Sequence, residues 1–434
     1  METFLPFLIP AMIGLGMFAA LPAFSLAFSS GAPRGDATVS ESCSAARYRF
    51  AASVLVLVAQ MVLLRYFGYA SSTALGFMLM LLSAVAVSAN AYLKGWKAGL
   101  AAAGIYFAVF VLYWAMEKYL FAPSIFDWAS SLSPKVSDLT APMKLLALAG
   151  VSYIGFKLIH FMSDLYSGEI EEVEPIEFIS WLLFFPSIVA GPMMRFQDWV
   201  SQRGNASIDF NWIVEGVRRI AIGLFMKLAI ADVISGGTIA QMTQAQLAQA
   251  SAWQVAQGCA LYTVFLFFDF AGYSHIAIGA GLFWGIRLPE NFDKPYVARN
   301  LAEFWNRWHI SLSTILRDYL YYPLTLAIKR SPVFKGRVMA ATMLSPFLTF
   351  LAAGVWHGAG VNFIIYGALH GIGLGIVAVL KQRRRKGAFA LWWEKSLAGR
   401  IGGIALNFAY VSFTFLFFAL PWSSLSILLH RMVS

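Results

Sequence analysis

The sequence predicts an all-α, polytopic integral membrane protein with about eleven transmembrane helices, at about 20 residues per span. Of its 434 residues, 59% are hydrophobic and 12% are charged. Soluble domains average about 45–50% apolar and about 25% charged residues, so the composition excludes a soluble globular chain. The ten-residue alternation typical of membrane barrels is absent. Helices are therefore expected, because a backbone in lipid must satisfy its own hydrogen bonds.

Apolar segments follow one another along the whole chain. Residues 1–28 lack a basic stretch, and their apolar run is too long for a signal peptide, which predicts a first span rather than a cleaved signal. The run 252–286 is longer than one span needs, so we expect it to tilt, break or extend beyond the bilayer. No repeat or low-complexity linker is present, and one membrane domain is expected over 1–434. The other apolar segments are 52–66, 73–92, 99–121, 141–163, 176–194, 213–235, 338–355, 361–380 and 401–429.

The net charge of +10, from 32 Lys and Arg against 22 Asp and Glu, is explained first by basic loops that face the cytoplasm. The loop 381–400, KQRRRKGAFALWWEKSLAGR, carries the most positive charge and is expected there. The short loop with Lys94 and Lys97 is expected on the same side, and the loop 122–140 outside. Basic loops also suit the anionic lipids of the cytoplasmic leaflet. We therefore predict a multi-pass membrane protein, in contact with lipid and not with nucleic acid.

Motifs of several common enzymes are absent from the sequence. It has no GxxxxGK[ST] phosphate loop, no HExxH zinc helix and no CxxCH haem attachment. The stretch 272–276 approaches a GxSxG nucleophile elbow but lacks the second glycine. Two cysteines, Cys43 and Cys259, are too few for a disulfide framework, a zinc ribbon or an iron–sulfur site. We expect no metal and no permanently bound cofactor.

Ionisable residues inside apolar segments are candidate functional residues, because they are costly at bilayer depth. The first is Asp269 in FFDFAGYSHIAIGAG, with Tyr273 four residues later on the same helix face. In that arrangement the carboxylate could bond to the phenol. A carboxylate that locks two helices together is the structural alternative, and both interpretations stay open.

The second candidate region is NLAEFWNRWHISLSTILRDYLYYPL at 300–324, interpreted as one helix that ends near Pro323. At 100° per residue, five polar side chains fall within a sector of about 80°. The tryptophans and tyrosines around them are typical of a membrane interface. A solvated surface helix is the alternative, but the aromatic content favours a functional polar stripe. Its members are Arg299, Asn306, His309, Ser313 and Arg317.

The third candidate is His357 in LAAGVWHGAGVNFIIYGALHG at 351–371. Glycines crowd this histidine, and such a density bends or breaks a span and lets other groups approach the backbone. A lone histidine on an apolar helix is usually structural. The broken backbone around His357 favours a functional role instead.

Other polar and small residues in the spans are interpreted as structural. Downstream of His357, glycines spaced by four residues predict a helix-packing seam. On a neighbouring face, Asn362, Tyr366 and His370 are also spaced by four, and we interpret His370 as structural. Three residues on one face of the span 141–163 predict a buried ion-paired patch. The glycines are Gly367, Gly371 and Gly375, and the patch is Lys157, His160 and Asp164.

Two histidines on separate elements, His309 and His357, suggest proton transfer from a hydroxyl group. A histidine pKa near 6.5 suits the removal of a proton at neutral pH. A thioester donor needs little acid assistance, because a thiol with a pKa of about 8.5 leaves readily. Acyl transfer from a thioester to a hydroxyl therefore fits these residues without a metal, a nucleotide or a serine nucleophile.

Three long motifs, in this order, resemble the membrane-bound O-acyltransferase family. They are FFDFAGYSHIAIG, PENFDKPYVARNLAEFWNRWHISLSTILRDYLYYPL and GVWHGAGVNFIIYGALHG. The upstream stretch FFPSIVAGPMMRF is similar to a further segment of the family. The resemblance covers a motif-bearing core at about 150–375. It indicates the bacterial branch that holds alginate O-acetyltransferase and the teichoic-acid D-alanyltransferase.

The resemblance implies a ring of tilted helices around a central funnel or tunnel. It also implies that His357, in the WHG motif, is the catalytic base, and that His309, in the RWHIS motif, lies near it and is required. Such enzymes move an activated acyl group from the cytoplasmic side to a hydroxyl on the other side or within the membrane. The residues expected to bind substrate are Asn306, Ser313, Arg317, Asp269, Tyr273, Trp356 and Asn362.

Donor and acceptor stay open at this point. After YLYYPL, alginate-type sequences usually continue with a glycine-rich GGNR stretch, whereas this chain has TLAIKRSPVF at 325–334. The donor is acyl-CoA or an acyl-phosphopantetheine carrier protein, whose phosphates would meet Arg317, Lys329 and Arg330. We expect an acyl group, first of all acetyl, to reach a cell-envelope or exported polysaccharide, directly or through an acceptor-side transferase. D-alanyl transfer from a carrier protein to teichoic acid is the alternative.

Two classes outside acyl transfer compete with this hypothesis. A membrane transporter also uses broken helices and intramembrane charges, but we see no internal inverted repeat. A bis-histidine haem protein would use His309 and His357 as axial ligands and would show a Soret band. The three motifs favour the enzyme.

Overall fold

The computed structural model describes residues 153–433, with gaps at 166, 171–172, 174, 183, 189, 204–209, 335, 359 and 384–395. The expected spans before residue 153 lie outside this part, as do Cys43, Lys94, Lys97 and the centre of the basic loop 381–400. The chain divides into two compact units, Met1–Ile220 with Ala277–Pro289, and Ala221–Ile276 with Glu290–Ser434. The expectation of one membrane domain over 1–434 stays a prediction.

The described part of the first unit is helical and begins with a helical segment at 153–165. Phe161 of this segment packs on Trp181, with ring centroids 5.9 Å apart. The Trp181 indole N–H donates to the carbonyl of Met194 at 2.9 Å, which ties the loop before residue 196 to the helices. The elements that follow are α8 (Pro175–Leu182), α9 (Phe185–Ile188), α10 (Phe196–Arg203) and the first part of α11 (Phe210–Leu224).

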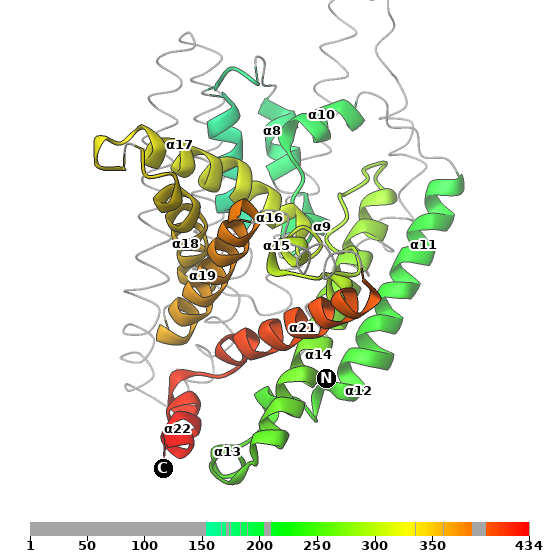
Figure 1. The fold of residues 1–434 in the computed structure, drawn as a ribbon. Coiled ribbons are helices and arrows are strands. Elements are labelled where there is room, and N and C mark those ends of the chain that lie inside the picture. Colours follow the sequence, from blue (N-terminus) through cyan, green and yellow to red (C-terminus); the bar gives the residue numbers. More distant parts are fainter. Residues whose placement is uncertain are drawn as a thin grey trace, which may run out of the picture. The chain divides into compact units, whose positions relative to one another are not determined.

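The second unit holds most of the described helices (Figure 1), and its described part has no strand beyond an isolated bridge between Phe292 and Trp308. Two stretches are π-helical, η2 (Phe225–Ala231) and η5 (Arg317–Tyr321). The long helix α14 (Ala252–Leu282) starts in this unit and ends in the first. The others are α12 (Asp232–Ser235), η3 (Ile239–Gln241), α13 (Gln244–Gln249), η4 (Pro295–Val297), α15 (Leu301–Trp305), α16 (Ile310–Leu316), α17 (Tyr322–Arg330), η6 (Pro332–Phe334), α18 (Val338–His357), α19 (Val361–Arg383), α21 (Leu397–Ala419) and α22 (Trp422–Val433).

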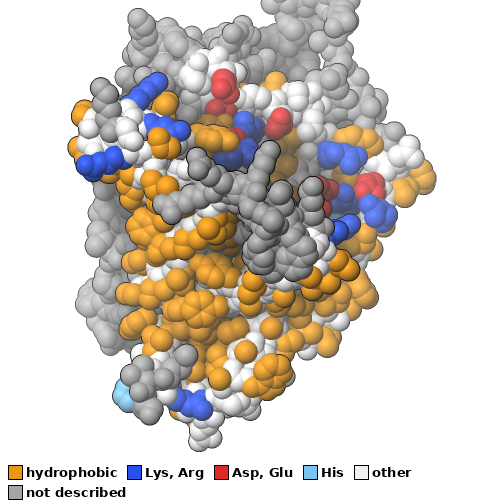
Figure 2. All heavy atoms as spheres, viewed as in Figure 1, with side chains coloured by type: hydrophobic (Ala, Val, Ile, Leu, Met, Phe, Trp, Pro, Cys, Tyr) orange, Lys and Arg blue, Asp and Glu red, His pale blue; other side chains and the backbone are white. Residues whose placement is uncertain are grey.

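Within the described residues, α14, α18, α19 and α21 are long and apolar enough to cross a membrane. They match four of the segments expected from the sequence. Their exposed positions include large apolar side chains such as Ile372 and Leu406. Figure 2 shows a broad hydrophobic surface in this view, and apolar surface on such a scale suits contact with lipid. The described part is therefore helical with several candidate spans, as predicted, and the total of about eleven stays a prediction.

Two expected segments need comment: the sequence left the course of one open, and the prediction of a single helix was wrong for the other. Helix α14 runs unbroken for 31 residues. At 1.5 Å per residue its length is about 46 Å, which exceeds a hydrocarbon core of about 30 Å, so it tilts or extends beyond the bilayer. The segment 401–429 is two helices rather than one. Helix α21 ends before Pro421, which has no N–H for the helix ladder and forces Leu420 into an extended conformation.

Glycines allow α18 and α19 to lie side by side (Figure 1). A methyl group added at Gly367 would collide with the backbone carbonyl of Phe350, and one at Gly371 would lie 2.6 Å from the Cα of Phe347. Gly375 faces the same helix. Because only glycine permits this backbone approach, the predicted packing seam is confirmed. The seam fixes the end of α18 against the start of α19.

The segment 300–324 is not the single helix that its periodicity predicted. Helices α15 and α16 are separated by a turn at 306–309. His309 in this turn has φ 45° and ψ 52°, a left-handed conformation that interrupts a right-handed helix. The five polar residues therefore do not form one helical stripe. Pro323 does not end a helix either, because the helical conformation continues from α16 through η5 into α17, and the π-helical stretch η5 directly precedes the proline.

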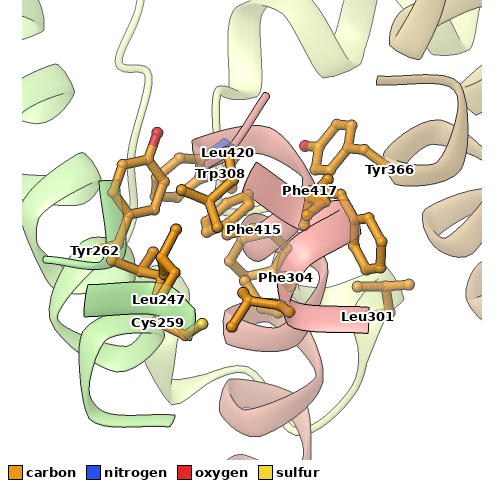
Figure 3. Packing of buried hydrophobic residues seen from close by; sticks show 14 of the residues in the cluster. Leu247, Cys259, Tyr262, Leu301, Phe304, Trp308, Tyr366, Phe415, Phe417 and Leu420 are labelled. Atoms are coloured by element: carbon orange, nitrogen blue, oxygen red, sulfur yellow. The ribbon is translucent and has the colours of Figure 1, made fainter. Parts of the chain in front are cut away.

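A buried aromatic core joins several elements of the second unit (Figure 3). Trp308 stacks on Phe304 of α15 and also contacts Phe415 of α21, each with centroids 5.5 Å apart. Tyr366 of α19 stacks on Phe415 at 6.1 Å. Aromatic pairs of this kind add about 0.5–1.5 kcal/mol each to the burial of their area. The core therefore holds the turn before α16 in place relative to α19 and α21.

Candidate functional site

His309 lies at the start of α16, in a buried position. Only 5% of its surface is exposed, and its ring meets the ring of Phe270 edge-on, with centroids 4.7 Å apart. Lys294 is the only other non-glycine residue with positive φ in the described part of the chain. Such a conformation is uncommon for a residue with a Cβ atom and persists where the surroundings impose it. Tertiary contacts, rather than local propensity, therefore set the backbone at this histidine.

Asn291, a residue with no predicted role, binds His309. It is 1% exposed, and its Oδ1 lies 3.3 Å from Nδ1 of His309. The same oxygen accepts hydrogen bonds from the Ser311 hydroxyl at 2.6 Å and from the Ser311 backbone N–H at 3.3 Å. The Nδ2 group donates to Ser274 of α14 at 3.2 Å. The stretch PENF that contains Asn291 begins the second motif, so the resemblance included this residue without distinguishing it.

His357 is the last residue of α18, at the break between α18 and α19. Its ring lies edge-on to Phe418 at 5.0 Å and to Tyr366 at 5.8 Å between centroids. Trp356 is adjacent, with ring centroids 4.5 Å apart. The chain leaves the helix at Gly358, as the glycine-rich sequence predicted. His357 is half-buried, so it combines aromatic walls with partial access.

The two histidines have neighbours that meet in the aromatic core, and the charge of His357 affects the pKa of His309. Trp308, next to His309, and Tyr366, against His357, both contact Phe415. Burial, with a further contribution from His357, lowers the pKa of His309 to about 3. His309 is therefore neutral near pH 7 and a weak base. Since a general base works best with a pKa near the operating pH, this favours His357 as the base and His309 as a neutral partner.

His370 has structural contacts on both ring nitrogens. It is fully buried, the Trp305 indole N–H donates to its Nδ1 at 3.2 Å, and its Nε2 lies 2.9 Å from the Thr414 hydroxyl. Because an indole N–H only donates, Nδ1 is the acceptor and Nε2–H donates to Thr414. The side chain thus joins α15, α19 and α21, which supports its structural interpretation. On the same face, Asn362 donates to the carbonyl of Phe417 at 3.1 Å.

The partner of Asp269 is Lys227 on η2, a residue with no predicted role. Lys227 is 8% exposed and its ammonium group binds the Asp269 carboxylate. Glycines let α14 approach the end of α11 and η2 here, since a methyl group at Gly272 would lie 2.8 Å from the carbonyl oxygen of Gly223 and 3.2 Å from the backbone nitrogen of Lys227. Lys227 also binds the Asp232 carboxylate at 3.0 Å, so its ammonium group links carboxylates of two separate helices, and this contact supports a structural role for Asp269. Tyr273, one turn further along α14, is 6% exposed.

The other members of the proposed polar stripe lie in different surroundings. The Ser313 hydroxyl donates to the carbonyl of Trp308 at 3.1 Å and so helps to fix the turn. The Arg317 side chain is 46% exposed and pairs with Asp318 at 2.9 Å. Asn306 is exposed. Substrate binding stays a prediction for Asn306, Ser313, Arg317, Asp269, Tyr273, Trp356 and Asn362.

The three residues of the predicted ion-paired patch, Lys157, His160 and Asp164, are all buried in the first unit, each at most 3% exposed, but Lys157 binds neutral groups and only His160 pairs with Asp164. Lys157 Nζ donates to the carbonyl of Trp181 at 2.9 Å and to the Ser187 hydroxyl at 2.8 Å. His160 Nδ1 lies 3.1 Å from the Asp164 carboxylate. These contacts join separate segments of the unit, which supports the structural interpretation.

Comparison with known proteins finds a matching family and several bacterial relatives. The family described as MBOAT, membrane-bound O-acyltransferase family, matches residues 105–420. The chain is 41% identical over 228 residues to the probable alginate O-acetylase AlgI of Pseudomonas syringae pv. tomato, covering 52% of this chain and 42% of that protein. It is 31% identical over 298 residues to the teichoic acid D-alanyltransferase of Streptococcus thermophilus, covering 65% and 70%. It is 37% identical over 243 residues to the peptidoglycan O-acetyltransferase of Helicobacter pylori, covering 55% and 44%. The chain thus spans less than half the length of the alginate and peptidoglycan relatives.

Proposed function

This chain belongs to the membrane-bound O-acyltransferase family, and we propose that it is an O-acyltransferase of a bacterial inner membrane. It moves an acyl group, expected to be acetyl, from a cytoplasmic thioester donor to a hydroxyl of a cell-envelope or exported polysaccharide. The observation that carries the proposal is the aromatic core, whose members Trp308 and Tyr366 lie next to His309 and against His357, at the ends of separate helices. The names of the relatives, which specify alginate, peptidoglycan and teichoic acid, support a polymer acceptor.

The proposed reaction forms one C–O bond and breaks one C–S bond. The acceptor hydroxyl oxygen attacks the thioester carbonyl carbon while the His357 ring takes the hydroxyl proton. The thiolate leaves and receives that proton from the same ring, so atoms and charge balance. His309 stays neutral and holds the acceptor or the His357 ring in position.

The proposal includes a route for the donor, through a funnel or tunnel that leads from the cytoplasm to the histidines. Helix α17 ends with Lys329 and Arg330, both exposed. Basic side chains are visible at the upper left of Figure 2, where Figure 1 places α17. Arg317 is less suited to this role because it pairs with Asp318. We therefore place the phosphates of CoA or of a phosphopantetheine arm at the end of α17. The acceptor, or a transferase that passes the acyl group on, binds on the other side.

Donor binding is expected to weaken as salt rises. Exposed charges are screened within about 8–10 Å at moderate ionic strength, so added NaCl should lower the affinity for acyl-CoA or an acyl-carrier protein. Replacing Lys329 and Arg330 together by Gln should lower the affinity and flatten its salt dependence. Calorimetry on vesicle-reconstituted protein at several salt concentrations measures both effects, with Arg431→Gln on α22 as the control. A donor affinity that does not change with the salt concentration would contradict a donor-binding site at the basic end of α17.

Two alternatives to acetyl transfer each have a specific observation in their favour. D-alanyl transfer from a carrier protein to teichoic acid uses the same histidine chemistry, and the streptococcal relative is covered over 70% of its length. A membrane transporter is the non-enzyme alternative, since broken helices and buried charges also suit transport. Transporters also use histidines in proton relays, so ester formation from a thioester by the purified protein, rather than a histidine variant, separates the enzyme from the transporter.

Mass spectrometry of surface and exported polysaccharides tests the proposed function. Cells without the gene should lose one acyl substituent, the wild-type gene should restore it, and a His357→Ala gene should not. The mass of the lost group distinguishes acetyl from D-alanyl. Polysaccharides that keep all their acyl groups in the deletion strain would contradict the proposal.

A further inference from the structure

We propose that Asn291 is a positioning residue that selects the Nδ1-protonated form of His309 and so presents Nε2 as a hydrogen-bond acceptor. The inference rests on the proposed acyl transfer for its functional meaning. Its structural content rests on the hydrogen bonds of one buried amide. Four contacts carry it, to His309 Nδ1, the Ser311 N–H, the Ser311 hydroxyl and the Ser274 hydroxyl.

A backbone group fixes the orientation of the Asn291 amide. A backbone N–H can only donate, so the amide atom that faces the Ser311 N–H at 3.3 Å must be the oxygen. The Ser311 hydroxyl, at 2.6 Å, can donate to the same oxygen. The amide nitrogen then faces Ser274 and donates to its hydroxyl at 3.2 Å. These partners remove the ambiguity between the two ends of an asparagine side chain.

The oriented amide determines which ring nitrogen of His309 carries the proton. Nδ1 lies 3.3 Å from Oδ1 of Asn291, and a carbonyl oxygen only accepts, so Nδ1 must be the donor. In the neutral ring Nε2 is then the acceptor. An acceptor hydroxyl, or an imidazole N–H, can donate to Nε2 in this form. The other tautomer would present a donor at the same place.

Asn291 is itself firmly held. Its backbone carbonyl accepts from the Ile310 N–H at 2.9 Å, so both its main chain and its side chain bind the start of α16. Ser274 connects it to α14, and Phe270, one turn earlier on α14, packs on the His309 ring. With 1% of Asn291 exposed, water has little access to compete for these bonds. A neutral amide also fixes the tautomer without the charge that a carboxylate would bring.

Side-chain ¹⁵N NMR of the full-length protein in lipid tests the inference. The chain has six histidines, and the His309 resonance is the one that disappears in His309→Asn. In the wild-type protein this ring should carry its proton on Nδ1. Asn291→Leu, which keeps the size but removes the acceptor, should shift the proton toward Nε2 and lower turnover per folded molecule at least about tenfold. Asn291→Asp keeps an oxygen opposite Nδ1, so it should retain the Nδ1 proton and more turnover than the Leu variant.

Asn407→Ala is the matched control, since Asn407 is a buried amide on α21, and it should change neither the His309 resonance nor turnover per folded molecule. If the Leu variant does not fold, Asn291→Ala provides the same readout. A proton that stays on Nδ1 without the Asn291 oxygen would overturn the inference, even in an active acyltransferase. A shifted proton in a protein without acyl transfer would support the positioning role and overturn only the proposed function.

Discussion

The His357→Ala variant is expected to lose turnover by about 10²–10⁴-fold, the usual contribution of a general base, while it stays folded and inserted. His357 ends α18 beyond the glycine seam and is half-buried, so its removal leaves the α18–α19 contact intact. Ester formation from an acyl thioester by purified protein in lipid vesicles measures the loss. Near-normal turnover would exclude His357 as the base.

Two other histidines give matched controls for this prediction. His430, exposed on α22, should be replaceable by Ala with no change in turnover. His370→Ala should instead lower the melting temperature, because it leaves the Trp305 N–H without its acceptor and removes one of the two hydrogen bonds of the Thr414 hydroxyl, which still donates to the carbonyl of Val411. Each buried polar group left unsatisfied costs about 1–3 kcal/mol. Turnover per folded molecule should be largely kept in this variant.

Substitution of His309 is expected to have a comparable effect on turnover. Asn is the best replacement, because it tolerates the φ of 45° at this position better than most residues with a Cβ atom. His309→Asn should lose turnover by at least about 10²-fold, with a melting temperature near that of the wild type. A structural histidine would give the opposite result, with lower stability and expression but full activity per folded molecule. Turnover and melting in detergent, measured on the same samples, distinguish the two outcomes.

Local physical rules made the described helices predictable from the sequence. The bilayer sets the length of a span, so the segments expected at 338–355 and 361–380 agree closely with α18 and α19. The seam with Gly367 follows from backbone sterics alone. The helix end at His357 follows from the glycines around it. The spans and the helix end need no tertiary partner, and the seam needs only the backbone of a neighbouring helix, whatever its side chains.

The details around His309 depend on distant partners and could not be read from spacing. A helical wheel assumes a continuous helix, but contacts in the aromatic core and with Asn291 impose a turn at His309. Asn291 lies 18 residues before His309, and Lys227 lies 42 residues before Asp269. Tertiary packing chooses such pairs from many equivalent polar residues. The two-histidine prediction did not require these partners, because it rested on the motifs and on imidazole chemistry.

The turnover of the double variant His309→Asn/His357→Ala tests most directly whether the two histidines form one site. Residues that act as a unit are strongly non-additive in their effects on rate. We therefore predict that the double variant in lipid vesicles is within a few-fold of the slower single variant, at equal amounts of folded protein. A loss equal to the product of the two single losses would show that the histidines act independently and would contradict the account.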